Sequence, residues 1–190
     1  VVAGTIHGDS PYGVFDRVVN DLGVQPTSFK ATDIIIITNP VKTPDGLNSI
    51  KRVMSVTEVR KHWNLDPLQE GGFVDLLRYN VEKDELEPTQ ELINGDSEVI
   101  KSIARKVKRS ARNWEADYDN ILLRGKVKQL LVGLAENLKK PELLEGKFNA
   151  LANQVLHRIS DEVREEFGLP KSEQVISRWQ QWLYDAARKL

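Results

Sequence analysis

The chain has 190 residues, with 27 lysines and arginines against 28 aspartates and glutamates, so its net charge is −1. A balance of this kind excludes a polycationic wrap for nucleic acid as a property of the whole molecule. Cysteine is absent, which excludes disulfides, a thiol nucleophile and thiolate metal sites. No apolar run approaches the roughly 20 residues that a membrane helix needs.

The two halves of the chain differ in charge and in pattern. Residues 1–95 carry 9 basic and 14 acidic residues, a net of −5, together with most of the glycine and proline. Residues 96–190 carry 18 basic and 14 acidic residues, a net of +4. We therefore expect an α/β domain over 1–95 and an all-α domain over 96–190, with a boundary near Glu91–Asp96.

The first elements of the acidic half combine short strands with one helix. The apolar run Val1–His7 predicts a buried strand. Ser10 and Pro11 predict a helix start, because serine caps free amides and proline suits the first helical position. Gly23 is typical of a helix end.

Further strands follow in this half. Four consecutive β-branched residues, Ile34–Ile37, predict a fully buried strand. Residues 50–60 alternate loosely, and residues 73–80 and Leu86 flank a charged segment, 82–85, that resembles a β-hairpin turn.

The basic half has helical periodicity. We expect a helix capped by Ser97, one over Asp119–Lys139, one opened by Pro141 and ended by Gly168, and one from Ser172. The residues expected to face inward in the second and third of these are Leu122, Val127, Leu130, Leu131, Leu134, Leu138, Leu144, Phe148, Leu151, Val155, Ile159, Val163 and Phe167. These helices predict a bundle or cap.

The densest group of chemically versatile residues is Gly4-Thr5-Ile6-His7-Gly8-Asp9-Ser10-Pro11-Tyr12-Gly13. It combines a strand end, a polar turn and a helix start, which is where ligands of α/β sheets gather. A histidine there can bind a phosphate or position a water. The alternative is structural: His7 satisfies a turn, and Ser10 only caps a helix.

The longer stretch from Gly4 to Val24 resembles the histidine-box region of the type II/IV secretion ATPases. The Thr-Ile-His and Ser-Pro pairs are similar to the archaeal branch, which includes pilus, archaellum and secretion motors. Thr27–Asp33, the isoleucine run and Val56-Thr57-Glu58-Val59-Arg60 fit the same family. The resemblance covers about residues 1–90, and the helical tail matches only by position and character.

The resemblance implies a fold and a site. It implies that residues 1–95 are the C-terminal half of a RecA-like P-loop ATPase core, followed by a helical C-terminal region. His7 matches the box histidine, which implies contact with the γ-phosphate or the catalytic water, and Thr5 matches the polar residue two positions earlier. The implied cofactors are ATP and Mg²⁺. The implied assembly is a cytoplasmic hexamer, peripheral at the inner face of the membrane and bound to a platform protein.

The sequence also departs from that family. A phosphate-cradling loop reads G-x-x-x-x-G-K-S/T, and no such segment exists here; Gly125-Lys126 lacks the upstream glycine and the following hydroxyl residue. The sequence contains no strand for the Walker B acid ahead of the run that carries His7. The chain begins without methionine, inside an apolar run. We therefore expect a C-terminal portion that neither binds ATP tightly nor hydrolyses it alone.

A second candidate surface is basic. Lys101, Arg105, Lys108 and Arg112 share one helix face, opposite an apolar face, and no acidic residue interrupts the segment from 101 to 112. A face of this kind binds an acidic partner, anionic lipid or nucleic acid, or is simply solvated. We favour a partner subunit or the membrane platform, because no aromatic residues alternate with the charges for nucleic-acid stacking.

The remaining candidates are structural in our interpretation. His7, His62 and His157 lie on separate elements without a ligand partner at metal-binding spacing, so no metal site is predicted. Trp114, Trp179 and Trp182 are predicted to anchor helix packing. The leading hypothesis is the motor ATPase portion. The alternative is a non-catalytic module that docks through its helical tail, and a nucleic-acid binder is the weakest hypothesis.

Overall fold

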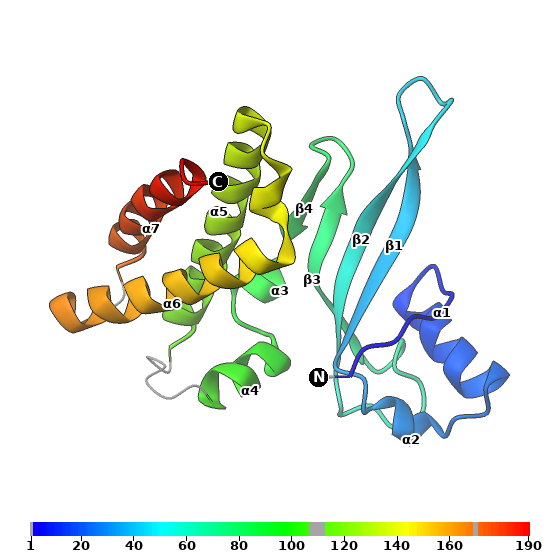
Figure 1. The fold of residues 1–190 in the computed structure, drawn as a ribbon. Helices are drawn as coiled ribbons and strands as arrows, with labels where there is room; N and C mark the ends of the chain where they lie inside the picture. Colours follow the sequence, from blue (N-terminus) through cyan, green and yellow to red (C-terminus); the bar gives the residue numbers. More distant parts are fainter. Residues whose placement is uncertain (1, 107–112, 169–170) are drawn as a thin grey trace. The chain divides into compact units, whose positions relative to one another are not determined.

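A computed structural model describes residues 2–106, 113–168 and 171–190 (Figure 1). The chain divides into two compact units, Val1–Arg109 (unit 1) and Ser110–Leu190 (unit 2). The division lies after the boundary expected near residues 91–96, because the helix that follows residue 97 belongs to unit 1.

Unit 1 is built on a four-stranded antiparallel sheet (Figure 1). The strands are β1 (Ile34–Lys42), β2 (Ser49–Val59), β3 (Phe73–Asn80) and β4 (Glu85–Pro88), and they are hydrogen-bonded in sequence order. The predicted β3–β4 hairpin is confirmed, with Asn80 paired to Glu85 across the turn.

Strand β1, at the edge of the sheet, is buried on one face only. The prediction of a fully buried strand is therefore wrong. Ile35 and Ile37 are buried, whereas Ile36 between them is 58% exposed. Successive side chains of a strand point to opposite faces, so a strand covered on one face buries only alternate residues.

Three short helical segments lie at the end of the sheet where β1 begins (Figure 1). They are α1 (Pro11–Asp16), the π-helical η1 (Arg17–Asp21) and α2 (Pro26–Phe29). Phe15 of α1 makes edge-to-face contacts with Phe29 and Trp63, and these rings pack with Ile35 and Ile37. The small core of unit 1 therefore lies between the sheet and α1–α2.

The strand predicted over Val1–His7 is wrong for the residues that the structure describes. Residues 2–7 have no helix or strand, and Val2 is fully exposed. A strand needs a neighbouring strand for its hydrogen bonds, and β1 to β4 pair only among themselves in the described part of the chain.

Two helices complete unit 1. They are α3 (Gln90–Ile93), capped by Thr89, and α4 (Glu98–Lys106). The predicted Ser97 cap is confirmed, since its Oγ accepts a hydrogen bond from the Ile100 amide at 3.1 Å. Ile103 of this helix is 59% exposed.

Unit 2 is a helical bundle, as predicted. It contains α5 (Trp114–Leu138), the 3₁₀ turn η2 (Pro141–Leu144), α6 (Gly146–Phe167) and α7 (Ser172–Ala187). Helix α5 begins five residues before the predicted start, because Asn113 caps it by accepting from the Ala116 amide at 2.8 Å.

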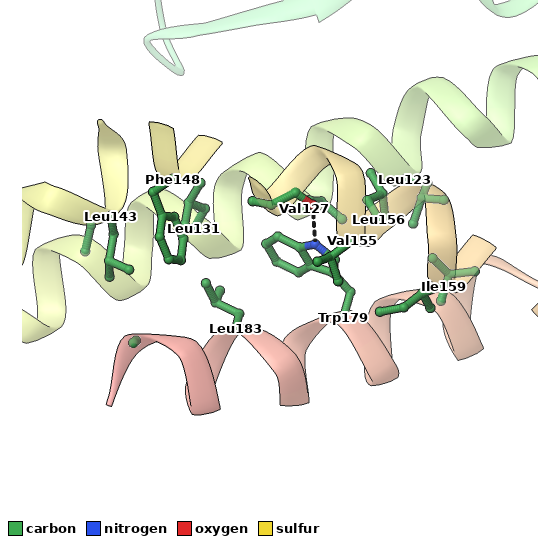
Figure 2. Packing of buried hydrophobic residues seen from close by; sticks show 14 of the residues in the cluster. Leu123, Val127, Leu131, Leu143, Phe148, Val155, Leu156, Ile159, Trp179 and Leu183 are labelled. Carbon is green, nitrogen blue, oxygen red and sulfur yellow. Dashed lines mark hydrogen bonds between the residues drawn. The ribbon is translucent and has the colours of Figure 1, made fainter. Parts of the chain in front are cut away.

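Trp179 lies in the centre of the bundle core (Figure 2). It is fully buried, and its indole nitrogen donates to the Ala152 carbonyl at 3.0 Å. Trp182 stacks on Phe148. The predicted packing role of both tryptophans is confirmed.

The predicted inward faces of the bundle helices are correct in register but too wide. Val127, Leu131, Phe148, Val155, Ile159 and Val163 are buried as expected. Five residues expected inward are 43–52% exposed instead: Leu122, Leu138, Leu144, Leu151 and Phe167. Leu123, Ala152 and Leu156 are buried in addition to the expected set.

The described strands make antiparallel pairs throughout, in an order that follows the sequence. They neither support nor contradict the RecA-like assignment, which stays a prediction. Among the described residues, no helix combines the length and apolar character that crossing a membrane would require.

Candidate functional site

Thr5 and His7 lie in the extended segment that leads into α1. Both residues are exposed. Gly8 lies directly over Val14 of α1, and a Cβ at this glycine would stand only 2.7 Å from Val14 Cγ2. Gly8 therefore lets the chain pass close to the helix immediately after His7.

The start of α1 follows the sequence prediction. Ser10 Oγ accepts from the Gly13 amide at 3.0 Å, and Pro11 occupies the first turn. Gly13 lies against this cap, because a Cβ there would be 3.0 Å from Asp9 Oδ1 and 3.1 Å from Ser10 Oγ. The polar turn thus has a structural role at Ser10, while His7 stays at the surface.

An open cleft of about 770 Å³ lies beside this helix start. Its walls come from Ser10–Tyr12, from β3 between Phe73 and Arg78, and from Pro88–Glu91. Neither Thr5 nor His7 lines it. The cleft therefore neighbours the predicted phosphate-contacting residues in sequence without including them.

Asp75 and Arg78 are two of the charged residues that line this cleft. Arg78 Nη2 lies 2.7 Å from Asp75 Oδ2, and this hydrogen-bonded ion pair raises the pKa of Arg78 above its ordinary value. Asp75 Oδ1 also accepts from Thr57 Oγ1 at 2.5 Å. Because the two side chains are held in an ion pair, neither is available as a free acid or base.

The most buried charge of unit 1 lies on β2. Glu58 has 0% exposure. Its carboxylate accepts from Ser97 Oγ at 2.5 Å and from the amides of Glu98 and Val99 at 3.0 and 3.3 Å. These donors form the first turn of α4, whose dipole favours a negative charge there.

Arg60 completes the surroundings of this carboxylate. Its Nε lies 3.0 Å from Glu58 Oε1, although this N–H is not directed at the oxygen as a hydrogen bond. Its Nη1 lies 3.0 Å from Glu98 Oε1, and its Nη2 donates to the Asp96 carbonyl. With its oxygens occupied, Glu58 anchors α4 to the sheet and is not available as a free acid or base.

Sequence reasoning did not single out Glu58, Asp75 or Arg78. The available signal for Glu58 was an acidic residue inside the apolar strand pattern Val56-Thr57-Glu58-Val59. Such a residue needs a buried partner. The identity of that partner depends on contacts 39 to 41 residues away along the chain.

The predicted basic face is described only in part. Lys101 is half-buried and Arg105 is exposed on α4. Lys108 and Arg112 lie outside the described residues. The single basic face therefore stays a prediction.

The other histidines have local partners. His62 Nε2 lies 2.8 Å from the Glu70 carbonyl, and His157 Nε2 lies 3.4 Å from Arg124 Nη2. The described part of the chain contains no group of three or more histidine, aspartate or glutamate side chains arranged to hold a metal ion.

No protein-family model and no curated protein matches this chain. The family assignment made from the residues therefore stays a prediction.

Proposed function

We propose that this chain is the C-terminal portion of a hexameric secretion or pilus-assembly motor ATPase, which couples ATP hydrolysis to protein transport or filament assembly. The observation that carries the proposal is the unbroken run from Gly4 to Val24, with its Thr-Ile-His and Ser-Pro pairs. ATP and Mg²⁺ would be bound by the complete protein.

The geometry of the N-terminal segment supports this assignment. Thr5 and His7 are exposed, so both side chains are free to meet a nucleotide held by residues outside this chain. The close packing of Gly8 on Val14 ties the position of His7 to α1. In the complete motor, His7 would contact the γ-phosphate or orient the attacking water, and Thr5 would add a polar contact.

The chain by itself is not competent for hydrolysis under this proposal, because it contains no G-x-x-x-x-G-K-S/T loop. Purified chain mixed with Mg²⁺ and ATP is expected to show turnover no higher than a buffer control. Robust Mg²⁺-dependent turnover would contradict the proposal.

The role of His7 is tested in the complete protein. His7→Ala is expected to lower the ATP turnover number by roughly 100-fold or more, as for loss of a group that positions a reacting water. His157→Ala, an exposed histidine of unit 2, is the matched control and should leave turnover within about twofold. Equal effects of the two substitutions would remove the assignment of His7.

The proposed location is the inner face of the membrane, through a platform protein of the secretion or pilus system. The basic residues Lys101, Arg105, Lys108 and Arg112 are the candidate contact, through an acidic partner surface rather than nucleic acid. Their replacement by serine should weaken co-purification with the membrane fraction without changing the fold of unit 1, which contains three of the four.

A second candidate is a non-catalytic interaction module that docks to a secretion or pilus platform through its helical tail. It is favoured by the missing phosphate loop together with a separate compact helical unit. The mass of the native protein in its own cells distinguishes the motor from the interaction module. A protein large enough to include an upstream ATPase core supports the motor, and one close to the length of this chain supports the module.

A further inference from the structure

Helix α5 has a second apolar stripe on the side away from the bundle core. Its core side contributes Leu123, Val127, Leu131 and Ala135. On the opposite side, Leu122 and Val132 remain 52% and 43% exposed. Tyr118, Leu122, Gly125, Gln129 and Val132 form this outer stripe.

The spacing of the outer stripe is that of a helix-pairing seam. Its members follow one another by four, three, four and three residues, which is the heptad spacing by which one helix packs along another. Three of the five are apolar or aromatic side chains, and one is glycine. The stripe therefore has the periodicity of a contact surface for a second helix.

Gly125, in the centre of the stripe, has no packing reason within the described chain. A Cβ at this position would meet nothing within 4 Å. Glycine weakens a helix interior relative to alanine, and one advantage that it offers in return is close approach of another backbone.

The charged residues that flank the outer stripe are complementary between two antiparallel copies of the helix. Asp119 and Lys126 lie seven residues apart on the same flank of α5, and both are exposed. In an antiparallel helix pair, equivalent flanking positions face each other, so Asp119 of each copy meets Lys126 of the other. The same alignment sets Leu122 over Gly125 of the second copy and Tyr118 opposite Gln129.

We propose that α5 pairs antiparallel with α5 of a second copy of this chain, about a two-fold axis near residues 123–124. A parallel pair would leave Asp119 and Lys126 without opposite charges across the interface. A single helix pair buries less surface than a standard interface, so the dimer is weak. This inference does not depend on the proposed function.

Sedimentation velocity of the full chain tests the proposal. Between about 1 and 300 µM, the chain is expected to shift from monomer to dimer with a micromolar dissociation constant. A chain that stays monomeric throughout overturns the proposal.

Charge reversal identifies the interface. Asp119→Lys and Lys126→Asp should each weaken the dimer about tenfold, and the double swap should return it to within about threefold of the parent. Lys147→Asp, at an exposed position of α6, is the control and should change nothing. The proposal is overturned if the double swap dimerises as weakly as the single variants. It is also overturned if none of these substitutions changes the dissociation constant of the dimer.

Lys126→Asp and Gly125→Ala separate a weaker dimer from a misfolded chain. Asp119 also accepts a hydrogen bond from Ser172 Oγ, so the Lys126→Asp variant alone keeps the test valid if Asp119→Lys does not fold. Gly125→Ala should raise the thermal unfolding temperature while weakening the dimer, because alanine favours the helix but blocks close approach. Alanine that leaves the dimer unchanged contradicts the proposed alignment.

Discussion

At the scale of single residues, Glu58 is the clearest case of a side chain whose role comes from distant contacts. It lies on β2 with no exposure, and the first turn of α4 and Arg60 surround its carboxylate. A buried charge that is fully paired contributes little net stability, but removing one partner leaves the others uncompensated. Glu58 therefore fixes where α4 begins.

Glu58→Gln is expected to lower the free energy of unfolding of unit 1 by about 2–4 kcal/mol, because Arg60 and the helix amides lose their anion. Denaturant unfolding measures the loss, and hydrogen exchange of the α4 amides should localise it. Glu98→Gln is the control: its side chain is 58% exposed, so its cost should stay below about 1 kcal/mol. Equal costs would contradict the anchoring role.

Glu70, in the loop between β2 and β3, is a second residue whose side chain holds a segment of backbone in place. Its carboxylate accepts from the amides of Leu65, Asn64 and Asp66 at 2.7–2.8 Å. These hydrogen bonds to the charged form hold the pKa of Glu70 below its ordinary value of 4.5. The carboxylate thereby orders a loop that has no regular structure of its own.

The lowered pKa of Glu70 predicts a pH dependence. The ionised Glu70 stabilises the folded chain above about pH 4.5, the ordinary pKa of a glutamate. This stabilisation is lost as the pH falls through the lower pKa that Glu70 has in the folded chain. Glu70→Gln should therefore be less stable than the parent at pH 7, with a difference that shrinks in acid. Denaturant titrations at both pH values measure this, with Glu82→Gln in an exposed turn as control. A difference that is constant with pH would contradict it.

At the scale of elements, α5 ends on a strained residue. Lys139 has φ of +54°, the left-handed conformation that glycine usually occupies at a helix end. The Lys140 amide closes the helix by donating to the Ala135 carbonyl at 2.9 Å. The sequence predicted the end of this helix to within one residue, but nothing in its residues indicated which one would take the left-handed conformation.

Lys139→Gly should raise the free energy of unfolding of unit 2 by about 0.5–1 kcal/mol, because glycine adopts this conformation without a Cβ clash. Lys128→Gly, the same substitution in the interior of α5, should lower it by about 1 kcal/mol. Thermal and denaturant unfolding of the two variants give the comparison. The same sign for both would contradict the structural reason.

At the scale of the whole molecule, each unit has its own hydrophobic core with a fully buried tryptophan. Trp63 lies in the core of unit 1 and Trp179 in that of unit 2. Trp179 donates to the Ala152 carbonyl, whereas the indole nitrogen of Trp63 is buried with no hydrogen-bond partner among the described residues.

This difference predicts unequal costs for one substitution. Trp179→Phe removes both volume and a hydrogen bond, and should cost unit 2 about 2–3 kcal/mol. Trp63→Phe removes volume but also an unsatisfied donor, so its cost to unit 1 should be smaller, about 1 kcal/mol. Hydrogen exchange resolved along the chain measures each effect in its own unit. A larger cost at Trp63 would contradict the prediction.

Features that depend on neighbouring residues could be predicted from the order of side chains alone. Helical spacing predicted the bundle, Ser10 and Ser97 predicted two helix starts, and the charged segment after Asn80 predicted a hairpin. These follow from interactions within a few residues, which the order of side chains specifies directly. The contact of Thr5 and His7 with a nucleotide stays a prediction from the run that contains them.

Which apolar and charged residues are buried follows from contacts between distant segments, not from the local pattern. Ile36 and Leu122 are exposed although their patterns predicted burial. Glu58 is buried although charged residues usually lie at the surface. Residues 2–7 read as a strand but lie unpaired, because strand hydrogen bonds need a neighbour that local sequence does not specify. Burial and pairing depend on segments that are far apart along the chain, so only the folded arrangement determines them.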